Sequence, residues 1–580
     1  MSDLRSFTTN AVSLRTRGGA AADIVVFAAV VVFLWLLVAL SQGVLAPFDQ
    51  ATAPSTVSTD PSLLPYYAAR SLLRMFVALL ASVVFTFVYA TAAARSRRAE
   101  KILLPLLDVL QSVPVLGFLS VTLSVWLTMF PSTELGVELA SVFAIFTSQA
   151  WNLTFSFYQS LTTQPRDLDE AARLFRLTRW QRFWKLDVPH GMIPLVWNGM
   201  MSFGGGWFFL IASEVISVNN HTFALPGIGS YVAAASQQEQ IDKLLLAIAV
   251  MVVMVVGVNF LFWRPLTAWA ERFRTGDTVT VNQQRSLVLD LIRRSSLPRI
   301  VARIWRPVGA GLERLSRPLG PTGAPLRTDE RRRRTGDVVF LVLTIGMLAW
   351  GIVSMLGFVA ERAGLDQFLV AAGLGLVTFA RVVVLVVVGT VVWVPIGLWI
   401  GLNPSVTRIA QPIVQVLASF PANFLFPFFT MALLWTGISL DLGGILLMSL
   451  GAQWYILFNV IAGAAMIPND LREAAASLRL TRRPRWRNLY LPAIFTSWVT
   501  GGITAAGGAW NASIVAEVVS YGNHTLVATG LGAYIARATA EGDFARTLVG
   551  VTVMSLFVVG LNRLLWRRLY RLAEHRISLS

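Results

Sequence analysis

Two charged segments carry the residues whose types and spacing are most suited to a specific task. The first runs from Pro165 to Pro189 and the second from Pro468 to Pro492, and each lies between strongly hydrophobic stretches. Both read Pro, Asp two residues later, Glu-Ala-Ala, Leu-Thr-Arg and a closing apolar-x-apolar-Pro, at a constant offset of 303 residues. Repetition at one spacing indicates that the two segments do the same work.

Helix-capping chemistry accounts for part of this pattern. In both segments an Asp stands three residues before the Glu, which is the spacing of a capping box: Asp167 with Glu170, and Asp470 with Glu473. Thr178 and Gln181 predict a second helix start directly afterwards. In the repeat Pro484 replaces Gln181, and proline is tolerated only in the first turn of a helix.

Ionisable residues also lie inside hydrophobic stretches, at matched positions Arg74 and Arg381. An Arg facing lipid costs roughly 2.5 to 3.5 kcal/mol on insertion scales, so it usually faces protein or a water-filled cavity. Two of them could form a positive pair on a transport pathway, suited to an anion. The alternatives are snorkelling to the outer head groups and pairing with Glu214 and Glu517, which are also matched.

Glycines recur beside two matched tryptophans. Gly204 to Gly206 correspond to Gly507-Gly508, and small residues let neighbouring helices approach closely. The adjacent Trp207 and Trp510 either gate a pathway or fill the core.

No enzyme site is evident in the sequence. Cysteine is absent, which excludes disulfides and thiolate chemistry, and the four histidines are too scattered to indicate a metal cluster. None of the three lysines follows a Gly, so there is no phosphate-binding loop and the chain cannot hydrolyse ATP by that route. We therefore expect no catalytic residue, no metal and no cofactor in this chain.

Composition indicates an integral membrane protein. Of 580 residues 55% are hydrophobic, the mean hydropathy is +0.64, and the apolar residues form runs of about 20, the length that spans a bilayer core. The net charge of +17 would suggest nucleic acid on a soluble domain, but most Arg residues lie in loops between the hydrophobic runs and read as topology signals.

Six spans fit each half of the chain. In the first half they are expected near 24–44, 66–94, 104–130, 135–160, 192–218 and 243–265, and in the second near 338–358, 370–402, 412–436, 442–466, 494–520 and 546–566. Pro114 and Pro421 should kink the third spans. The distribution of Lys and Arg places both termini and both charged segments in the cytoplasm.

The two halves are an internal duplication joined by a basic linker. Residues 1–265 form the first repeat, 266–337 the linker and 338–580 the second repeat. An even number of spans in each half gives parallel repeats with a pathway between them. From Glu271 to Asp337 there are fifteen Arg against seven acidic residues, and Ser286 to Trp305 has helical apolar spacing. That stretch is either a surface-lying amphipathic helix or a solvated tether.

The charged segments resemble the EAA loops of bacterial ABC importer permeases. The pattern is Glu-Ala-Ala, three residues, Gly, nine residues and an aliphatic-x-aliphatic-Pro close, and it matches Glu170, Ala171, Ala172 and Glu473, Ala474, Ala475. The family's Gly position holds Arg176 and Arg479, which puts the local turn geometry in question. The sequences around SEVISV and LPGIGSY are similar to the permeases for nitrate, taurine, alkanesulfonates and bicarbonate.

This resemblance implies an all-α polytopic membrane protein with two parallel six-helix repeats, about twelve transmembrane helices, and the type I ABC importer permease fold. It implies two cytoplasmic ATPase subunits that bind ATP and Mg, a periplasmic or lipid-anchored substrate-binding protein, and a location in the bacterial inner membrane. The EAA helices, with Leu168, Ala171, Ala172 and Phe175 on one face, would dock on the ATPases and drive alternating access for a small anion.

Two other classes remain open at this point. An ion-coupled secondary transporter also uses parallel six-helix repeats, and Glu214 and Glu517 are its matched candidates for the coupling ion. A membrane-embedded enzyme is disfavoured because no His or carboxylate set converges. Neither class requires a cytoplasmic docking helix at the same place in each half, so the doubled segments favour the ABC permease.

Overall fold

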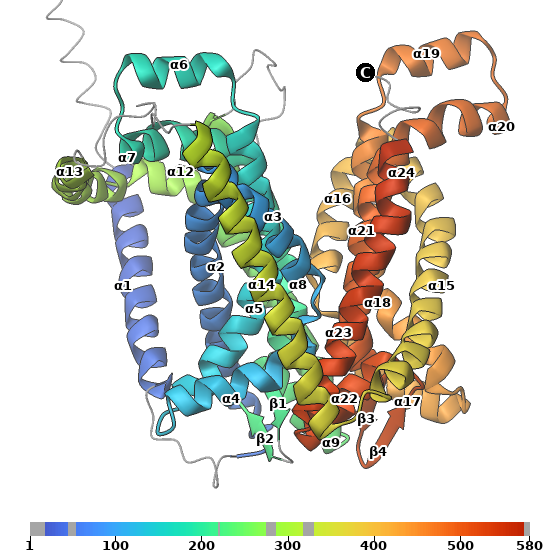
Figure 1. The fold of residues 1–580 in the computed structure, drawn as a ribbon. Helices are drawn as coiled ribbons and strands as arrows, with labels where there is room; N and C mark the ends of the chain where they lie inside the picture. The colour runs from blue at the N-terminus through green and yellow to red at the C-terminus, as the bar shows by residue number, and fades with distance from the viewer. Residues whose placement is uncertain (1–17, 45–53, 219–220, 274–285, 317–329, 573–580) are drawn as a thin grey trace, which may run out of the picture.

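Two helical halves stand side by side in the computed structural model (Figure 1). The structure describes residues 18–44, 54–218, 221–273, 286–316 and 330–572. The N-terminal arginines, the linker residues 274–285 and 317–329, and the C-terminus beyond Leu572 lie outside the described residues.

Five long helices build each half, and their order repeats. In the first half they are α1 (Gly18–Val44), α2 (Leu64–Arg95), α5 (Leu135–Thr162), α8 (Val188–Ser213) and α10 (Ile241–Val258). In the second half they are α14 (Glu330–Arg362), α15 (Gln367–Leu402), α18 (Leu440–Ala465), α21 (Leu491–Ala516) and α23 (Phe544–Leu561). These bounds agree with ten of the expected spans to within several residues, except that the fifth span of each half ends early and α14 begins before its span.

The third span of each half is broken, which corrects the single helices expected over 104–130 and 412–436. A short 3-10 turn separates two helices in each: α3 (Arg97–Ser112), η2 (Val115–Phe118) and α4 (Leu119–Met129), then α16 (Pro404–Ser419), η7 (Ala422–Leu425) and α17 (Phe426–Thr436). The break falls at Pro114 and Pro421, both extended, and the second pair bends by 77°. The predicted proline kinks are therefore confirmed, since proline cannot continue the helical hydrogen bonds.

The fifth spans end earlier than expected and give way to hairpins. Strands β1 (Val215–Val218) and β2 (His221–Ala224) pair antiparallel, as do β3 (Val518–Tyr521) and β4 (His524–Val527). The helices expected over 192–218 and 494–520 are thus wrong beyond Ser213 and Ala516. The β-branched residues Val215, Ile216 and Val218 favour strand over helix here. The short helices α9 (Ile228–Gln237) and α22 (Leu531–Glu541) follow.

Seven described helices are long and apolar enough to cross a membrane, or eight if α16 and α17 form one bent span. The expected number of about twelve is therefore not confirmed among the described residues. Helices α5 and α21 are not among the seven, although they are long. Their polar and small residues lower the hydropathy: Gln149 of α5 is buried beside Gly206, and Gly507 of α21 lines a cavity.

The two charged segments, which we call the EAA loops, fold in the same way and lie at one end of the molecule (Figure 1). Each contains a nine-residue helix, a four-residue helix and a π-helical turn: α6 (Arg166–Leu174), α7 (Arg179–Arg182) and η3 (Phe183–Asp187), then α19 (Asn469–Ser477), α20 (Arg482–Arg485) and η8 (Trp486–Tyr490). The linker contributes α11 (Arg264–Ala270), α12 (Leu287–Arg294) and α13 (Leu297–Ser316), and the last described helix is α24 (Arg567–Leu572).

The broken third spans connect the two cores. Val115, Leu116 and Leu123 of the first half belong to the hydrophobic cluster that is otherwise built mainly from the second half. Phe424 and Tyr521 of the second half belong to the cluster of the first half. Each half therefore contributes buried apolar residues to the other, which fixes the two halves around a shared central space.

Candidate functional site

The nine-residue EAA helices begin without the predicted side-chain caps. Pro165 and Pro468 occupy the N-cap positions, and neither offers a side-chain acceptor. Asp167 and Asp470 lie inside the first turn, so the capping box expected with Glu170 and Glu473 is wrong. The second predicted start is confirmed, because Gln181 N donates to Thr178 Oγ1 at 3.2 Å and Thr178 N donates to Gln181 Oε1 at 3.1 Å.

Both EAA helices end on an arginine in the left-handed conformation. Arg176 and Arg479 each have φ of 49°, where a side chain is strained and glycine is favoured. The next amide then turns back, so Leu177 N donates to the carbonyl of Ala172 at 3.0 Å and Leu480 N to that of Ala475 at 3.1 Å. The backbone therefore adopts the turn for which the EAA pattern uses Gly, although Arg occupies the position.

Exposure defines which side of these helices can meet a partner. Glu170 and Glu473 are exposed, whereas Ala172 and Ala475 are buried against their own chain. The expected docking face is therefore corrected, because Ala172 faces inward. The apolar residues presented outward are Leu174 and Phe175 at the end of α6 and Leu478 at the end of α19, which are 73 to 80% exposed.

Ion pairs brace the first EAA loop. Asp169 binds Arg182 of α7 and lies 2.7 Å from the Arg173 guanidinium, and Arg182 also approaches Asp187 at 3.6 Å. Asp187 in turn binds Arg95 at the end of α2. Burial raises the pKa of Asp169, but the charges and hydrogen bonds of Arg182 and Arg173 outweigh it and hold that pKa below its usual value.

The second loop lacks this chain of ion pairs among its described contacts. Arg472 stands at the position of Asp169 and donates to the carbonyl of Leu402 at 3.1 Å, which ties α19 to the end of α15. Tyr490 stands at the position of Asp187. The two loops therefore share a backbone and differ in how they are attached.

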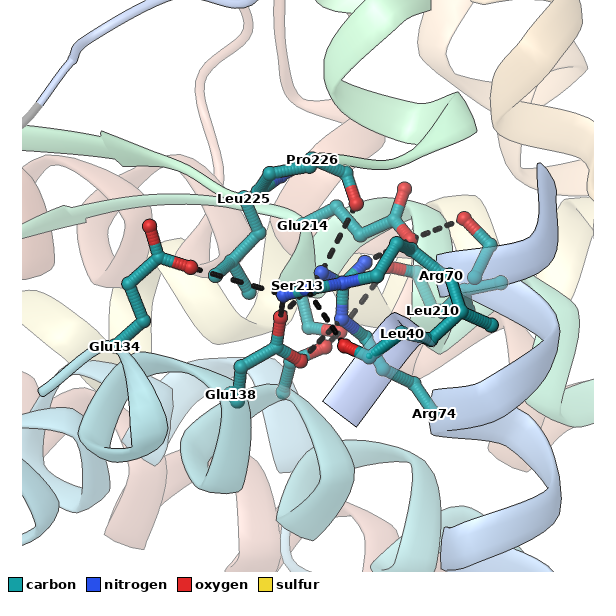
Figure 2. A network of polar contacts seen from close by, with 12 residues as sticks. Leu40, Arg70, Arg74, Glu134, Glu138, Leu210, Ser213, Glu214, Leu225 and Pro226 are labelled. Carbon is teal, nitrogen blue, oxygen red and sulfur yellow. Dashed lines mark hydrogen bonds and ion pairs between the residues drawn. The ribbon is translucent and has the colours of Figure 1, made fainter. Parts of the chain in front are cut away.

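Arg74 lies at the centre of a buried polar network at the opposite end of the first half (Figure 2). Its guanidinium contacts Glu138 at 2.6 Å and Glu214 at 2.7 Å and donates to the carbonyl of Pro226 at 3.0 Å. Arg70 also binds Glu138 and donates to the carbonyl of Leu40 in α1 at 3.2 Å. Four charges are thus neutralised inside the protein, which a low-dielectric interior requires.

The second half builds the same network with fewer charges. Arg381 binds Glu517 at 2.8 Å and Asp441 at 2.6 Å, and Thr378 Oγ1 donates to Glu517 at 2.8 Å. Of the alternatives for Arg74 and Arg381, the geometry shows pairing with Glu214 and Glu517. Sequence reasoning missed Glu138 and Asp441, although their offset of 303 residues marks them as a matched acidic pair.

A glycine closes over each buried glutamate. A Cβ added at Gly227 would lie 2.3 Å from the Glu214 carboxyl, and one at Gly530 would lie 2.2 Å from that of Glu517. The amide of Gly229 then donates to Glu214 at 2.6 Å, while that of Ala533 donates to Glu517 at 3.0 Å. The similar stretches LPGIGSY and SEVISV therefore meet in space, with the carboxylate at the start of the short helix.

A cavity of about 1030 Å³ lies between the two halves. The matched glycines Gly204, Gly205, Gly507 and Gly508 form part of its lining. Neutral polar side chains come from both halves: Gln111, Ser148, Asn152, Tyr455, Asn511 and Asn562. The charged residues of the lining are Asp108, Arg563 and Arg567. The Arg74 and Arg381 networks are not part of this lining. Trp510 borders the cavity, whereas Trp207 packs against Phe203 beside it.

The cavity extends toward the end that carries the EAA loops, whereas the two halves meet at the other end. Helix α24, which contributes Arg567 and Tyr570 to the lining, lies at the EAA end (Figure 1). At the hairpin end the halves meet directly, because Gly522 N donates to the carbonyl of Ser236 at 3.0 Å. Ser236 Oγ also donates to the carbonyl of Ser520 at 3.4 Å.

The acidic side chains of the described residues are not arranged as metal ligands. Among the described residues, no three His, Asp or Glu side chains converge as a metal ion would need. The glutamates inside the protein are instead held by arginine and by backbone amides.

Known proteins with similar sequences are transport permeases. This chain is 26% identical over 201 residues to a putative ABC transporter permease protein of Methanocaldococcus jannaschii, covering 35% of this chain and 70% of that protein. It is 28% identical over 217 residues to the nitrate import permease protein NrtB of Synechocystis, covering 37% and 72%. It is 26% identical over 179 residues to the bicarbonate transport system permease protein CmpB of Synechococcus elongatus, covering 31% and 58%.

One family matches the chain twice, over residues 82–264 and 393–579, and together these matches cover more than half of it. Each match contains one EAA loop and one of the matched glutamates Glu214 and Glu517, so the duplication seen in the sequence is a duplication of this family's unit. The chain therefore belongs to the family of the binding-protein-dependent transport system inner membrane component.

Proposed function

We propose that this chain is the complete membrane pathway of an ATP-driven importer for a small anion such as nitrate, a sulfonate or bicarbonate. The repeats 1–265 and 338–580 form its two walls, and 266–337 joins them on the cytoplasmic side. Two cytoplasmic ATPase subunits bind ATP and Mg and dock on α6 and α19. A periplasmic or lipid-anchored binding protein delivers the anion at the hairpin end. The location is the bacterial inner membrane, with both termini in the cytoplasm.

The central cavity is the observation that carries this proposal. It lies between the halves, it extends toward the EAA end through α24, and hydrogen bonds join the halves at the hairpin end. An inward-open state of an alternating-access transporter would have this arrangement. Closing the EAA end would require the two loops to approach each other, which is the movement that closure of paired ATPases supplies.

The cavity chemistry supports an anion. Neutral amide and hydroxyl groups line its middle, and these can donate hydrogen bonds to nitrate, sulfonate or bicarbonate oxygens. Arg563 and Arg567 lie at the cytoplasmic end and would attract a negative solute. The family relatives named for nitrate and bicarbonate import point to the same class.

Co-purification tests the partners and the substrate together. The chain is co-expressed with ATPase and binding-protein genes from its chromosomal neighbourhood, purified by a tag on this chain, and assayed for ATP hydrolysis in lipid with a panel of anions. We expect hydrolysis to rise with one loaded binding protein. If no ATPase associates and uptake instead follows an ion gradient, the chain is a secondary transporter, for which Glu214 and Glu517 are the candidates.

Distances between the halves test alternating access. Thr163 and Met466 are matched, exposed residues at the ends of α5 and α18, and the chain has no native cysteine to remove. Spin labels on Thr163→Cys and Met466→Cys should come closer when ATP is added to the complex. An unchanged distance distribution in a complex that hydrolyses ATP would contradict closure at this end.

A further inference from the structure

The linker helix α13 has one apolar and one basic face, and both are open. Its apolar residues recur at helical spacing and are each at least 40% exposed: Ile300, Ile304, Val308, Leu312 and Leu315. On the opposite face lie Arg299, Arg303, Arg306 and Arg314 with a single acidic residue, Glu313. A helix with a basic face and an uncovered apolar face is typical of the boundary between head groups and acyl chains.

Two contacts fix this helix at the cytoplasmic end of the first half. At its start, Ser296 Oγ donates to Asp23 of α1 at 2.8 Å. Near its end, Lys185 Nζ lies 2.9 Å from Glu313 Oε1. Lys185 belongs to η3, directly behind the first EAA helix. Helix α13 therefore runs from the first span to the first EAA loop.

The attachment to α1 places α13 at the level of the membrane surface. Ile24 and Val25, next to Asp23, are 71% and 53% exposed and apolar, so α1 meets lipid from this point onward. In Figure 1, α13 is seen end-on, whereas the spanning helices run from top to bottom. Its axis therefore lies across the spans rather than along them, as a helix lying in the membrane surface requires.

We propose that α13 lies on the anionic lipid surface of the membrane and, through the Lys185–Glu313 pair, fastens the first EAA loop to it. Four arginines against one glutamate match anionic head groups, and the apolar face matches the acyl-chain boundary below them. The second loop has Asn488 at the position of Lys185. In the part of the chain that the structure describes, no linker helix has an ion pair to that loop. The proposal does not depend on which solute is transported.

Accessibility of single spin labels on the full-length chain tests the lipid contact. Ile304→Cys reports the apolar face and Arg303→Cys the basic face, in vesicles of phosphatidylcholine with 30% phosphatidylglycerol. Leu348→Cys in α14 serves as the lipid-facing control and Leu478→Cys in α19 as the aqueous control. We expect the label at 304 to be as accessible to oxygen, which partitions into lipid, as the label at 348. The label at 303 should be as accessible to a water-soluble nickel complex as the label at 478.

The charge requirement is tested by the triple variant Arg299→Gln, Arg303→Gln, Arg306→Gln. Each surface Arg contributes about 1 kcal/mol of attraction to anionic lipid, so the variant should bind the surface roughly a hundredfold less well. Its label at 304 should become nickel-accessible in these vesicles. Two results would overturn the proposal. In the first, the label at 304, with all arginines present, is as accessible to the nickel complex as the label at 478. In the second, the label at 304 is shielded from both oxygen and the nickel complex, but only after the ATPase is added.

The connection of α13 to the first EAA loop through Lys185 and Glu313 is tested by the mobility of spin labels on the two loops. Phe175→Cys and Leu478→Cys are matched and equally exposed positions. In a Lys185→Gln background the label at 175 should become more mobile, whereas the label at 478 should not change. Unchanged mobility at 175 would overturn the connection between α13 and the first loop.

Discussion

The two EAA loops have one backbone and two kinds of attachment. Both helices span nine residues, start at a proline, end on a left-handed arginine and lead into a π-helical turn. The first loop is tied by Asp169, Asp187 and Lys185, whereas the second has Arg472, Tyr490 and Asn488 at those positions. Because the shape survives without the ion pairs, the ion pairs do not set the shape. They set how firmly each loop is held.

The largest effect on activity is expected from removing both matched glutamates. Glu170→Ala with Glu473→Ala should lower coupled ATP hydrolysis about tenfold or more, equivalent to roughly 1.4 kcal/mol of docking free energy. The exposed position of both carboxylates makes this a loss of partner contact rather than of folding. Membrane insertion and elution on size exclusion should stay normal. Coupling at the wild-type rate in the double variant would remove these residues from docking.

The buried networks should differ between halves when their matched acids are neutralised. Glu138 is 5% exposed and binds two arginines, whereas Asp441 is 50% exposed and binds one. Glu138→Gln should cost about 3 kcal/mol, because it leaves buried charge uncompensated. Asp441→Asn should cost below about 1 kcal/mol. Thermal unfolding of the two purified variants measures this, and equal losses would show that the second network is buried in solution.

The glycines over the glutamates should respond alike in both halves. Gly227→Ala and Gly530→Ala place a Cβ within 2.4 Å of a carboxylate and should each destabilise by about 1 to 3 kcal/mol. Gly257→Ala in α10 is the control, since nothing lies within 4 Å of its added Cβ. The unfolding temperature should fall for the first two and not for the third. A clear difference between 227 and 530 would contradict the shared closure.

A small effect, confined to the first EAA loop, is expected at Asp169. Asp169→Asn should loosen α6 by about 1 kcal/mol, as for a partly exposed ion pair. Faster amide hydrogen exchange in α6, with α19 unchanged, is the measurement. Since the folded pKa of Asp169 is lowered, its stabilisation is present above the unfolded pKa and is lost only as pH falls through the lower folded value. Exchange in wild-type α6 should therefore show no titration of this pair between about pH 5 and 8.

Features that depend on residues close together in the sequence were predicted correctly. Proline positions gave the breaks of the third spans, and Thr178 with Gln181 gave a helix start. The duplication followed from residues matched at an offset of 307 near the start of each half and of 303 from the charged segments onward, and the comparisons confirm it.

What the sequence did not show depends on contacts between distant segments. Arg74 meets Glu138, 64 residues away, and Glu214, 140 residues away, and no local pattern reveals such partners. The hairpins after α8 and α21 were missed because apolar strand residues continue a hydrophobic run without a break. The inward side of Ala172 depends on how α6 folds back, which the helical face alone does not specify.

Covalent joining of the halves also has a genetic consequence. In a pair of identical single-half permeases, any substitution is present in both subunits and must be tolerated in both places at once. Here every molecule contains one copy of each loop, so a substitution can arise and persist in one loop alone. The matched positions Asp169 and Arg472 differ in this way. The fusion thus allows the two sides to evolve separately while their spatial relationship stays fixed.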